Sequence, residues 1–344
     1  MKKILFLFII LCAQLSLTCC AQSKVTVKGQ FDGFTDDSLM VICQEIGADR
    51  NVQPLTAVIP VKDGKFEWST EVTTLHMAGF AAVPKEGERF GSKGYARAFL
   101  IPGEDVTISG TPLEDVVVSP FNSAVKMLDE QAESLSPEEA AVKAAEYIKA
   151  NPNNPAVVYA VGLLIKDVDA TVALISDEVK NGPAANMLKV NIAQAKHNAE
   201  MAEKRKNVAD GVMAPDFTLN DINGKPLALS SLRGKYVILD FWGSWCIWCI
   251  RGIPKMKEYY AKYKDKLEIL GVDCNDTDEK WKAAVKQHDI PWLHVYNPRT
   301  SDLLSTYAIE GFPTKIVIDP EGKIAKTIVG EDPKFYEYLD SLFQ

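Results

Sequence analysis

The chain has 344 residues, which is too long for one ordinary compact domain and suits two or three. Its hydrophobic content of 47% is normal for a globular protein. The formal net charge of -8 argues against nucleic acid as a partner, because binding to phosphates relies on clustered Lys and Arg side chains.

Residues 1–21 have the pattern of an export signal. After two lysines, the apolar core at 4–11 is too short and wrongly flanked to be a membrane-spanning helix. Residues 17–20 are similar to a bacterial lipoprotein box with Cys20 as the lipidated residue, although Cys19 stands where a small residue is usual. Ordinary signal cleavage is the alternative. In either case we expect the mature protein to work outside the cytoplasm, in the periplasm or cell envelope.

Residues 24–120 are expected to form a β-rich domain. Polar and apolar residues alternate in its first run, and Asp63-Gly64 marks a turn between two later runs. Short strands at this spacing are typical of a small β-sandwich. Cys43 lies within an apolar run and is interpreted as a core residue. The strand-like runs lie at 24–29, 38–43, 58–61, 65–68, 95–101 and 106–109.

The composition changes to Ala, Glu, Lys, Leu and Met over residues 121–206, with helical periodicity. Ser136 followed by Pro137 predicts the start of a helix, and the Asn- and Pro-rich segment 151–155 separates two helices. A long polar helix is predicted from 183 to 206. We interpret this region as a helical connector without a catalytic cluster.

Residues 207–344 alternate between strands and helices. An order of βαβα followed by a hairpin and a helix predicts an α/β domain, with one mixed sheet and helices on both faces. The predicted strands lie at 235–242, 266–274, 314–319 and 324–329, and the predicted helices at 249–264, 278–288 and 332–342.

Two cysteines separated by two residues, Cys246 and Cys249, stand between a predicted strand and a predicted helix. The N-terminus of a helix presents unpaired N–H groups and positive dipole charge, which stabilise a thiolate. The pattern favours thiol–disulfide exchange, and a structural disulfide is the alternative. Zinc would need a second ligand pair, and haem attachment would need His where Ile250 follows Cys249. We therefore expect neither a metal nor another cofactor.

Four segments carry a resemblance to a known family. With them, the C-terminal region resembles the thioredoxin fold and, more specifically, the TlpA/ResA-like extracytoplasmic thiol–disulfide oxidoreductases. The β-rich region resembles the DUF4369-type domain often fused to such proteins. The four segments are Ala-Pro-Asp-Phe-Thr-Leu at 214–219, Ser-Leu-Arg-Gly-Lys at 231–235, Asp-Phe-Trp-Gly-Ser-Trp-Cys at 240–246 and Gly-Phe-Pro-Thr at 311–314.

The resemblance implies a protein-disulfide oxidoreductase with a redox-active cysteine pair. Cys246, as the more exposed sulfur with the lower pKa, would attack a substrate disulfide and form a mixed disulfide. Cys249, more shielded, would resolve it. The implied partners are disulfide-containing exported proteins as substrates and a membrane dithiol relay as electron donor.

Two more site residues follow from the resemblance. Pro313 is expected to be cis and to lie opposite the cysteines, beside backbone that can pair with an extended substrate peptide. Asp240 lies in an apolar strand, where an acid is costly to bury. It is predicted to have a raised pKa and to accept the proton of Cys249; the alternative is an exposed or hydrogen-bonded carboxylate at the strand end. The family pattern has an acid three residues after the second cysteine, where this chain has Gly252.

Substrate contact is assigned to Trp245, Trp248 and Phe312. Ile247 and Trp248 extend an apolar surface around Cys246, to which Trp242 would also belong. The alternative is that Trp242 is core and Trp248 only covers the helix start.

Cys274 is interpreted as a buried thiol, with a third redox cysteine as the alternative. The four histidines are scattered without metal-ligand spacing and are interpreted as structural or surface residues: His76, His197, His288 and His294.

Two other functions compete with disulfide reduction. One is a thiol peroxidase, which is disfavoured because the motif Pro-x-x-x-Thr-x-x-Cys is absent at Cys246. The other is a redox-inactive lipoprotein that binds a ligand or a partner. The intact cysteine pair, Asp240 and the segment 312–314 argue against it.

Overall fold

The computed structural model describes residues 23–49, 51–92, 94–111 and 115–343. The predicted export signal, including Cys19 and Cys20, lies outside this range. The chain divides into two compact units, Met1–Ala199 and Glu200–Gln344, which are described separately. Across the described ranges, the helices are too short or too polar to cross a membrane.

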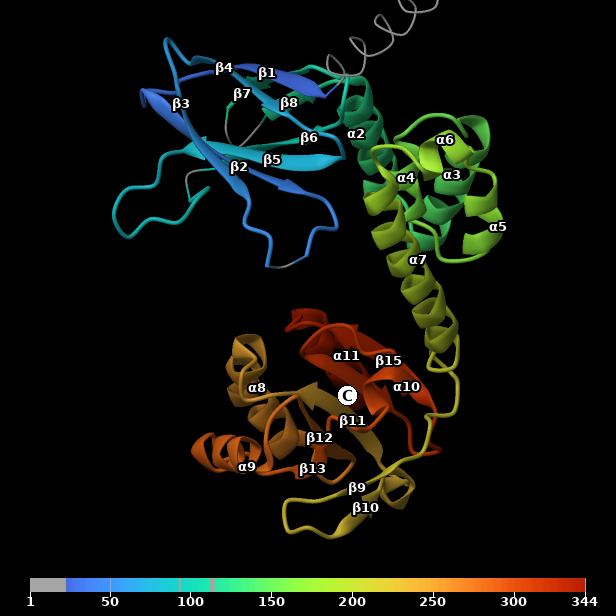
Figure 1. The fold of residues 1–344 in the computed structure, drawn as a ribbon. Coiled ribbons are helices and arrows are strands. Elements are labelled where there is room, and N and C mark those ends of the chain that lie inside the picture. The colour runs from blue at the N-terminus through green and yellow to red at the C-terminus, as the bar shows by residue number, and fades with distance from the viewer. Residues whose placement is uncertain (1–22, 50, 93, 112–114, 344) are drawn as a thin grey trace, which may run out of the picture. The chain divides into compact units, whose positions relative to one another are not determined.

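Two four-stranded sheets form the first part of the N-terminal unit (Figure 1). Their orders are β4-β1-β7-β8 and β3-β2-β5-β6. Alternate residues of β1 and β2, such as Val25 and Val41, are fully buried in one apolar core that both sheets share, as in a β-sandwich. The strands are β1 (Lys24–Phe31), β2 (Ser38–Glu45), β3 (Leu55–Pro60), β4 (Lys65–Glu71), β5 (His76–Ala82), β6 (Tyr95–Leu100), β7 (Val106–Gly110) and β8 (Asp115–Val118).

Six helices follow these strands. The predicted start at Ser136 is present: its side chain caps α3, and Glu139 closes a capping box. The helices bury a second apolar core, which also contains Leu75 and Ile101 from the β region. The helices are α2 (Pro120–Glu133), α3 (Pro137–Ala150), α4 (Val157–Val161), α5 (Val168–Ala173), α6 (Asp177–Lys180) and α7 (Ala185–Lys206).

The C-terminal unit is built on a five-stranded mixed sheet of order β13-β12-β11-β14-β15. The central strand β11 is parallel to β12 and antiparallel to β14. The strands are β11 (Tyr236–Trp242), β12 (Leu267–Cys274), β13 (Leu293–Asn297), β14 (Thr314–Ile318) and β15 (Ile324–Val329). A hairpin of β9 (Thr218–Asn220) and β10 (Pro226–Ala228) and the 3-10 turn η1 (Leu229–Leu232) precede this sheet.

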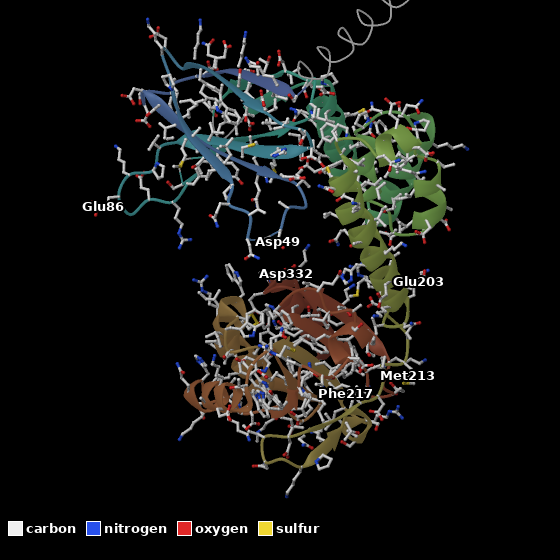
Figure 2. All side chains as sticks on the ribbon, viewed as in Figure 1. Asp49, Glu86, Glu203, Met213, Phe217 and Asp332 are labelled. Carbon is white, nitrogen blue, oxygen red and sulfur yellow. A yellow bond between two sulfur atoms is a disulfide. The ribbon has the colours of Figure 1, made fainter. Side chains whose placement is uncertain are left out.

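Helices cover both faces of this sheet, as predicted. Apolar residues of α8 (Ile247–Tyr263), α9 (Asp278–Gln287) and α11 (Pro333–Phe343) share one core with Ile238 and Trp242 of β11. The other face packs against α10 (Leu303–Thr306) and η1. On that face Phe217 lies edge-on to Tyr307, with ring centroids 6.1 Å apart. Phe217 is labelled in the C-terminal unit in Figure 2. Side chains of β11 point alternately to the two faces of the sheet, so their position in the strand decides which of them contact α8.

Candidate active site

The site begins where β11 ends. All residues of β11 after Tyr236 are buried, so the strand is fixed between two cores. The chain then turns, with the Cys246 N–H donating to the Gly243 carbonyl over 3.0 Å. Cys246 is the N-cap of α8, and its sulfur accepts the Cys249 N–H at 3.2 Å. One of the otherwise unpaired donors of the helix start therefore points at the Cys246 sulfur.

Cys246 and Cys249 form a disulfide whose Cα atoms are 5.3 Å apart. The side chains are 5% and 6% exposed, so the expected greater exposure of Cys246 is not observed. Because the bond joins the two sulfur atoms, both are buried to nearly the same extent at the helix start. What distinguishes them is position: Cys246 precedes the helix and Cys249 lies inside its first turn.

Large apolar side chains surround the disulfide. Trp245, Ile247 and Trp248 are 53%, 60% and 56% exposed. Trp245 lies edge-on to Phe312, with centroids 5.2 Å apart, and its indole N–H donates to the Cys274 carbonyl over 2.9 Å. Trp242 is buried in the core and is not part of this surface, because its position on β11 points it under α8.

The segment 311–314 contacts the turn before Cys246 through the Phe312 ring. The peptide bond between Phe312 and Pro313 is cis, as the resemblance implied. The Pro313 carbonyl accepts the Gly330 N–H at 2.7 Å, and the Thr314 hydroxyl donates to the Gly311 carbonyl over 2.7 Å. Within the described residues, the backbone N–H and C=O of Phe312 have no hydrogen-bond partner. This backbone is open to pairing with another chain.

Asp240 is buried in β11, on the face that meets α8. Its side chain is not exposed, and its Oδ1 has no hydrogen-bond partner within the described part of the chain. Burial raises the pKa of Asp240; nearby Lys315 lowers it and Glu331 raises it further. The raised pKa agrees with the prediction, and the alternative of an exposed carboxylate does not fit.

Two charged residues that the sequence analysis did not identify lie beside Asp240. Lys315 faces Asp240 across the β11–β14 pair and is 2% exposed. Its Nζ lies 2.8 Å from Glu331 Oε2, and the Tyr336 hydroxyl donates to Glu331 Oε1 over 2.5 Å. A lysine inside the apolar run 314–318 was the signal in the sequence, because a buried ammonium requires a buried acid nearby.

A second group of buried polar residues lies on β12 (Asp273), just after it (Asp276) and on β13 (His294). The Asp276 carboxylate accepts the Ser244 N–H at 2.6 Å and the Ser244 hydroxyl at 2.7 Å, so it holds the turn before Cys246. Burial, with Asp276 close by, raises the pKa of Asp273 to about 8. Burial lowers the pKa of His294 to about 3, which keeps its ring neutral. The interpretation of His294 as a structural residue fits this burial.

The remaining described cysteines are free and buried, as interpreted. Burial raises the pKa of the Cys43 thiol to about 11. Burial also raises the pKa of Cys274, whose Sγ lies 3.3 Å from the Val272 carbonyl oxygen in the core of the other face. A third redox cysteine is not supported at Cys274, because the thiol faces away from α8.

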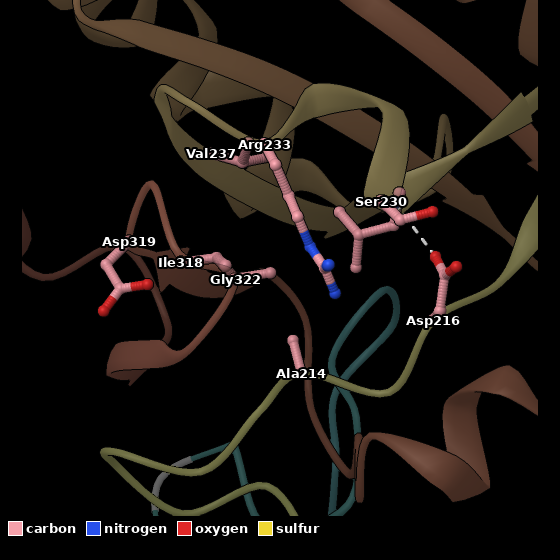
Figure 3. A pocket seen from close by; sticks show the side chains of 9 residues that line it. Ala214, Asp216, Ser230, Arg233, Val237, Ile318, Asp319 and Gly322 are labelled. Carbon is pink, nitrogen blue, oxygen red and sulfur yellow. Dashed lines mark hydrogen bonds between the residues drawn. The ribbon is translucent and has the colours of Figure 1, made fainter.

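The motifs at 214–219 and 231–235 meet at a small pocket (Figure 3). There the Asp216 carboxylate accepts the Ser230 N–H at 2.9 Å, close to Ala214 and Arg233. Hydrogen bonds from Ser230 lower the pKa of Asp216. The pocket belongs to the sheet face opposite α8, so these motifs support the fold at a distance from the disulfide.

The fold and the site define a thioredoxin-like thiol–disulfide oxidoreductase. The sequence model of the AhpC/TSA family matches residues 211–327. The thiol-disulfide oxidoreductase ResA of a Bacillus cereus strain is 38% identical over 144 residues, which are 42% of this chain and 81% of that protein. ResA of Bacillus subtilis (strain 168) is 34% identical over 147 residues, again 42% of this chain and 81% of that protein.

Because the chain covers most of the length of these relatives, it belongs to the ResA family of thiol-disulfide oxidoreductases. Among solved structures, the thioredoxin domain of a thiol-disulfide oxidoreductase from Bacteroides vulgatus is 34% identical, with a TM-score of 0.37. The match covers 40% of this chain and 99% of that domain.

Proposed function

We propose that this protein reduces disulfides in exported proteins, with Cys246 as the nucleophile and Cys249 as the resolving thiol. The observation that carries the proposal is the disulfide at the start of α8, with Cys246 as the N-cap and the Cys249 N–H directed at its sulfur. A thiolate at Cys246 would gain from this N–H and from the helix dipole.

The reaction runs in two steps. The Cys246 thiolate attacks a substrate disulfide, forms a mixed disulfide and releases one substrate thiolate, which takes a proton. The Cys249 thiolate then attacks the Cys246 sulfur, forms the bond between the two cysteines and releases the second substrate thiolate. The substrate gains two electrons and the cysteine pair loses them, so the oxidised pair in the structure is the product state. A dithiol donor must reduce it again.

Asp240 is proposed to accept the proton of Cys249. Its burial raises its pKa, which makes its carboxylate a stronger base than an exposed one and suits a group that accepts a proton. Its unpartnered Oδ1 has acceptor capacity left for that proton.

Substrate is proposed to bind over Trp245, Trp248 and Phe312. The two tryptophans offer exposed apolar area beside the disulfide, and the Phe312 backbone has an unpaired N–H and C=O. An extended peptide paired with this backbone beside cis-Pro313 would hold its disulfide near Cys246 by strand addition.

The export signal supports a location outside the cytoplasm, in the periplasm or cell envelope, with Cys20 as the site of a lipid anchor or ordinary cleavage nearby. The resemblance implies a membrane dithiol relay as the electron donor. We also propose four parts for the chain: the signal at 1–21, a DUF4369-like domain at 24–120, a helical connector at 121–206 and the thioredoxin-like domain at 207–344.

Two measurements test the proposal. Reduction of insulin disulfides by the mature protein should be lost in Cys246→Ser, because the attacking thiol is removed and Cys249 alone cannot complete both steps. In Cys249→Ala, the mixed disulfide cannot be resolved, so exported proteins should be captured through Cys246 and identified by mass spectrometry. Failure to capture any protein in cells that express this variant would contradict a protein-disulfide substrate.

Thiol peroxidase activity is a second candidate, favoured only by the AhpC/TSA match. The chain has Leu239 and Gly243 where the peroxidase motif would place Pro and Thr before the cysteine. Peroxide consumption by the reduced protein, if it exceeded disulfide reduction in rate, would favour this second function over the first.

A further inference from the structure

The helix that carries the cysteines has no side chain one turn after Cys249, where Gly252 stands. The space beside Gly252 is called the gap below. At Gly252, which is buried on α8, an added Cβ would collide with Glu331 Oε2 and lie 2.7 Å from Glu331 Cδ. The carboxylate of Glu331 therefore occupies the space that a side chain at position 252 would need. Because residues three apart share a helix face, this carboxylate lies on the Cys249 side of α8.

The Glu331 carboxylate is held in that gap from two sides. Lys315 of β14 lies 2.8 Å from Oε2, and the Tyr336 hydroxyl of α11 donates to Oε1 over 2.5 Å. Glu331 itself follows β15, so three elements besides α8 fix its position. A carboxylate with both oxygens partnered has little freedom to move.

Within the described residues, Lys315 is the one cation among the charged groups that act on Asp240, and it is paired with Glu331. The titratable groups on this side of Asp240 are Lys315, Glu331 and the Tyr336 hydroxyl, and the Cys274 thiol acts from β12. With its ammonium turned to Glu331, Lys315 leaves Asp240 Oδ1 unpartnered.

The other neighbour of Asp240 brings no charge. Gly271 of β12 stands opposite it, and the space over Gly271 is filled by the ring of His294 from β13. Burial lowers the pKa of His294 to about 3, so this ring is neutral wherever the cysteines react. Burial has the largest effect on the pKa of Asp240, and the balance between Lys315 and Glu331 adjusts how readily Asp240 takes a proton.

We propose that Glu331 is a positioning residue for the resolving step: by holding Lys315 from the gap at Gly252, it keeps Asp240 a strong enough base to take the proton of Cys249. The inference rests on the proposed function of the cysteine pair. Without the charge of Glu331, Lys315 would turn to Asp240, and both changes would favour the ionised form of Asp240. A weaker base accepts the Cys249 proton less readily, so fewer Cys249 thiolates attack the mixed disulfide.

The experiment follows the reduced, mature protein after mixing with an aromatic disulfide that releases a coloured thiolate. The first thiolate is released when Cys246 attacks, and the second when Cys249 resolves the mixed disulfide. Recording both releases against pH separates the two steps within one trace. In Cys249→Ala only the first release should occur, which assigns the second.

In Glu331→Gln, the second release should slow about three- to tenfold at neutral pH, and its pH inflection should move down by about one pH unit. The first release should not change. Lys315→Met should move the inflection up, because the cation that stabilises ionised Asp240 is gone. Loss of structure alone would not shift the pH inflection in opposite directions in Glu331→Gln and Lys315→Met.

Gly252→Ala tests the gap without touching a charged residue. Its Cβ should displace Glu331 and reproduce the effect of Glu331→Gln, and the double variant should be no slower than either single one. A swap that combines Gly252→Glu with Glu331→Gly should restore part of the second release. Glu337→Gln is the control: it removes one negative charge from an exposed position on α11 and should behave as the wild type.

Three results would overturn the proposal: superimposed pH profiles of Glu331→Gln and wild type, equal slowing of both releases, or additive effects of Gly252→Ala and Glu331→Gln. If Glu331→Gln does not fold, Gly252→Ala decides the question. If the wild type releases no thiolate at Cys246, the proposed function fails instead.

Discussion

Asp273 is fully buried on β12, and neither of its carboxyl oxygens has a hydrogen-bond partner in the described residues. Burial, with the neighbouring Asp276, raises its pKa from 3.8 to about 8. The folded protein therefore holds a proton that the unfolded chain has lost over this range. By linkage, the contribution of Asp273 to stability is complete below about pH 4 and is lost as the pH rises through about 8.

Asp273→Asn should remove this dependence, because the amide does not titrate. The stability difference between the variant and the wild type should move in favour of the variant as the pH rises from about 4 to about 8. Its slope should be at most about 1.4 kcal/mol per pH unit, the value for one proton. Thermal unfolding of both oxidised proteins across this range measures it. Parallel curves would mean that Asp273 titrates alike in the folded and unfolded states.

Asp240→Ala should slow the resolution of the mixed disulfide at neutral pH roughly a hundredfold or more, because a positioned base is lost. Attack by Cys246 should keep its rate. Stopped-flow release of the second thiolate measures the effect, with Asp240→Asn as a variant of nearly the same volume. A rate of resolution that matches the wild type at every pH would remove Asp240 from the mechanism.

The residues of the site differ in how far the sequence reveals them. Cys246, Cys249 and Pro313 stand in short contiguous motifs, so their neighbours along the chain identify them. Glu331 and Lys315 carry no local motif, and their importance arises from a contact between β14 and the segment after β15. Gly252 was recognised as the place of a missing acid, but only the fold reveals which carboxylate fills the space.

At the scale of the elements, helix ends were the easier features to predict. Ser136 and Glu139 form the capping box at the start of α3, with the Glu139 N–H and the Ser136 N–H each bonded to the other side chain. The bonds that the Glu139 carboxylate accepts from the Ser136 N–H and the Ser136 hydroxyl lower the pKa of Glu139. The signal is local, because the cap and its partner are three residues apart.

Ser136→Ala should lower the free energy of unfolding by about 1 kcal/mol, the usual cost of a lost N-cap side chain. Ser123→Ala is a matched control, since Ser123 is an exposed serine inside α2 whose backbone N–H donates to the Ser119 carbonyl. Denaturant unfolding of the two variants compares them directly. An equal effect of both changes would mean that the cap contributes nothing beyond a surface serine.

Strands without a strong local pattern were missed. β5 has the sequence His-Met-Ala-Gly-Phe-Ala-Ala, which lacks β-branched residues, yet it pairs with β2 and β6 in the middle of its sheet. β13 is short and pairs only with β12 among the named strands. Both strands form because the neighbouring strands supply hydrogen bonds and the core buries their side chains. These contacts come from residues far away in the sequence, so the segment alone does not reveal them.

At the scale of the whole molecule, each unit has its own apolar cores. Two cores lie in the N-terminal unit and two flank the sheet of the C-terminal unit. The division between Ala199 and Glu200 lies inside α7. The last turn of α7 belongs to the C-terminal unit because its Lys204 and Arg205 bond to Ser305 and Glu310. The sequence could mark the change of composition near 207 but not these side-chain contacts.

Separate cores predict that reduction of the disulfide acts on one unit. The bond closes a loop with a sequence separation of 3, so chain entropy gives it at most about 2 kcal/mol of stabilisation. Calorimetry of the mature protein should resolve two unfolding transitions, of which reductant lowers only one. The variant Cys246→Ser with Cys249→Ser should not respond to reductant at all. Movement of both transitions on reduction would show that the two units unfold as one.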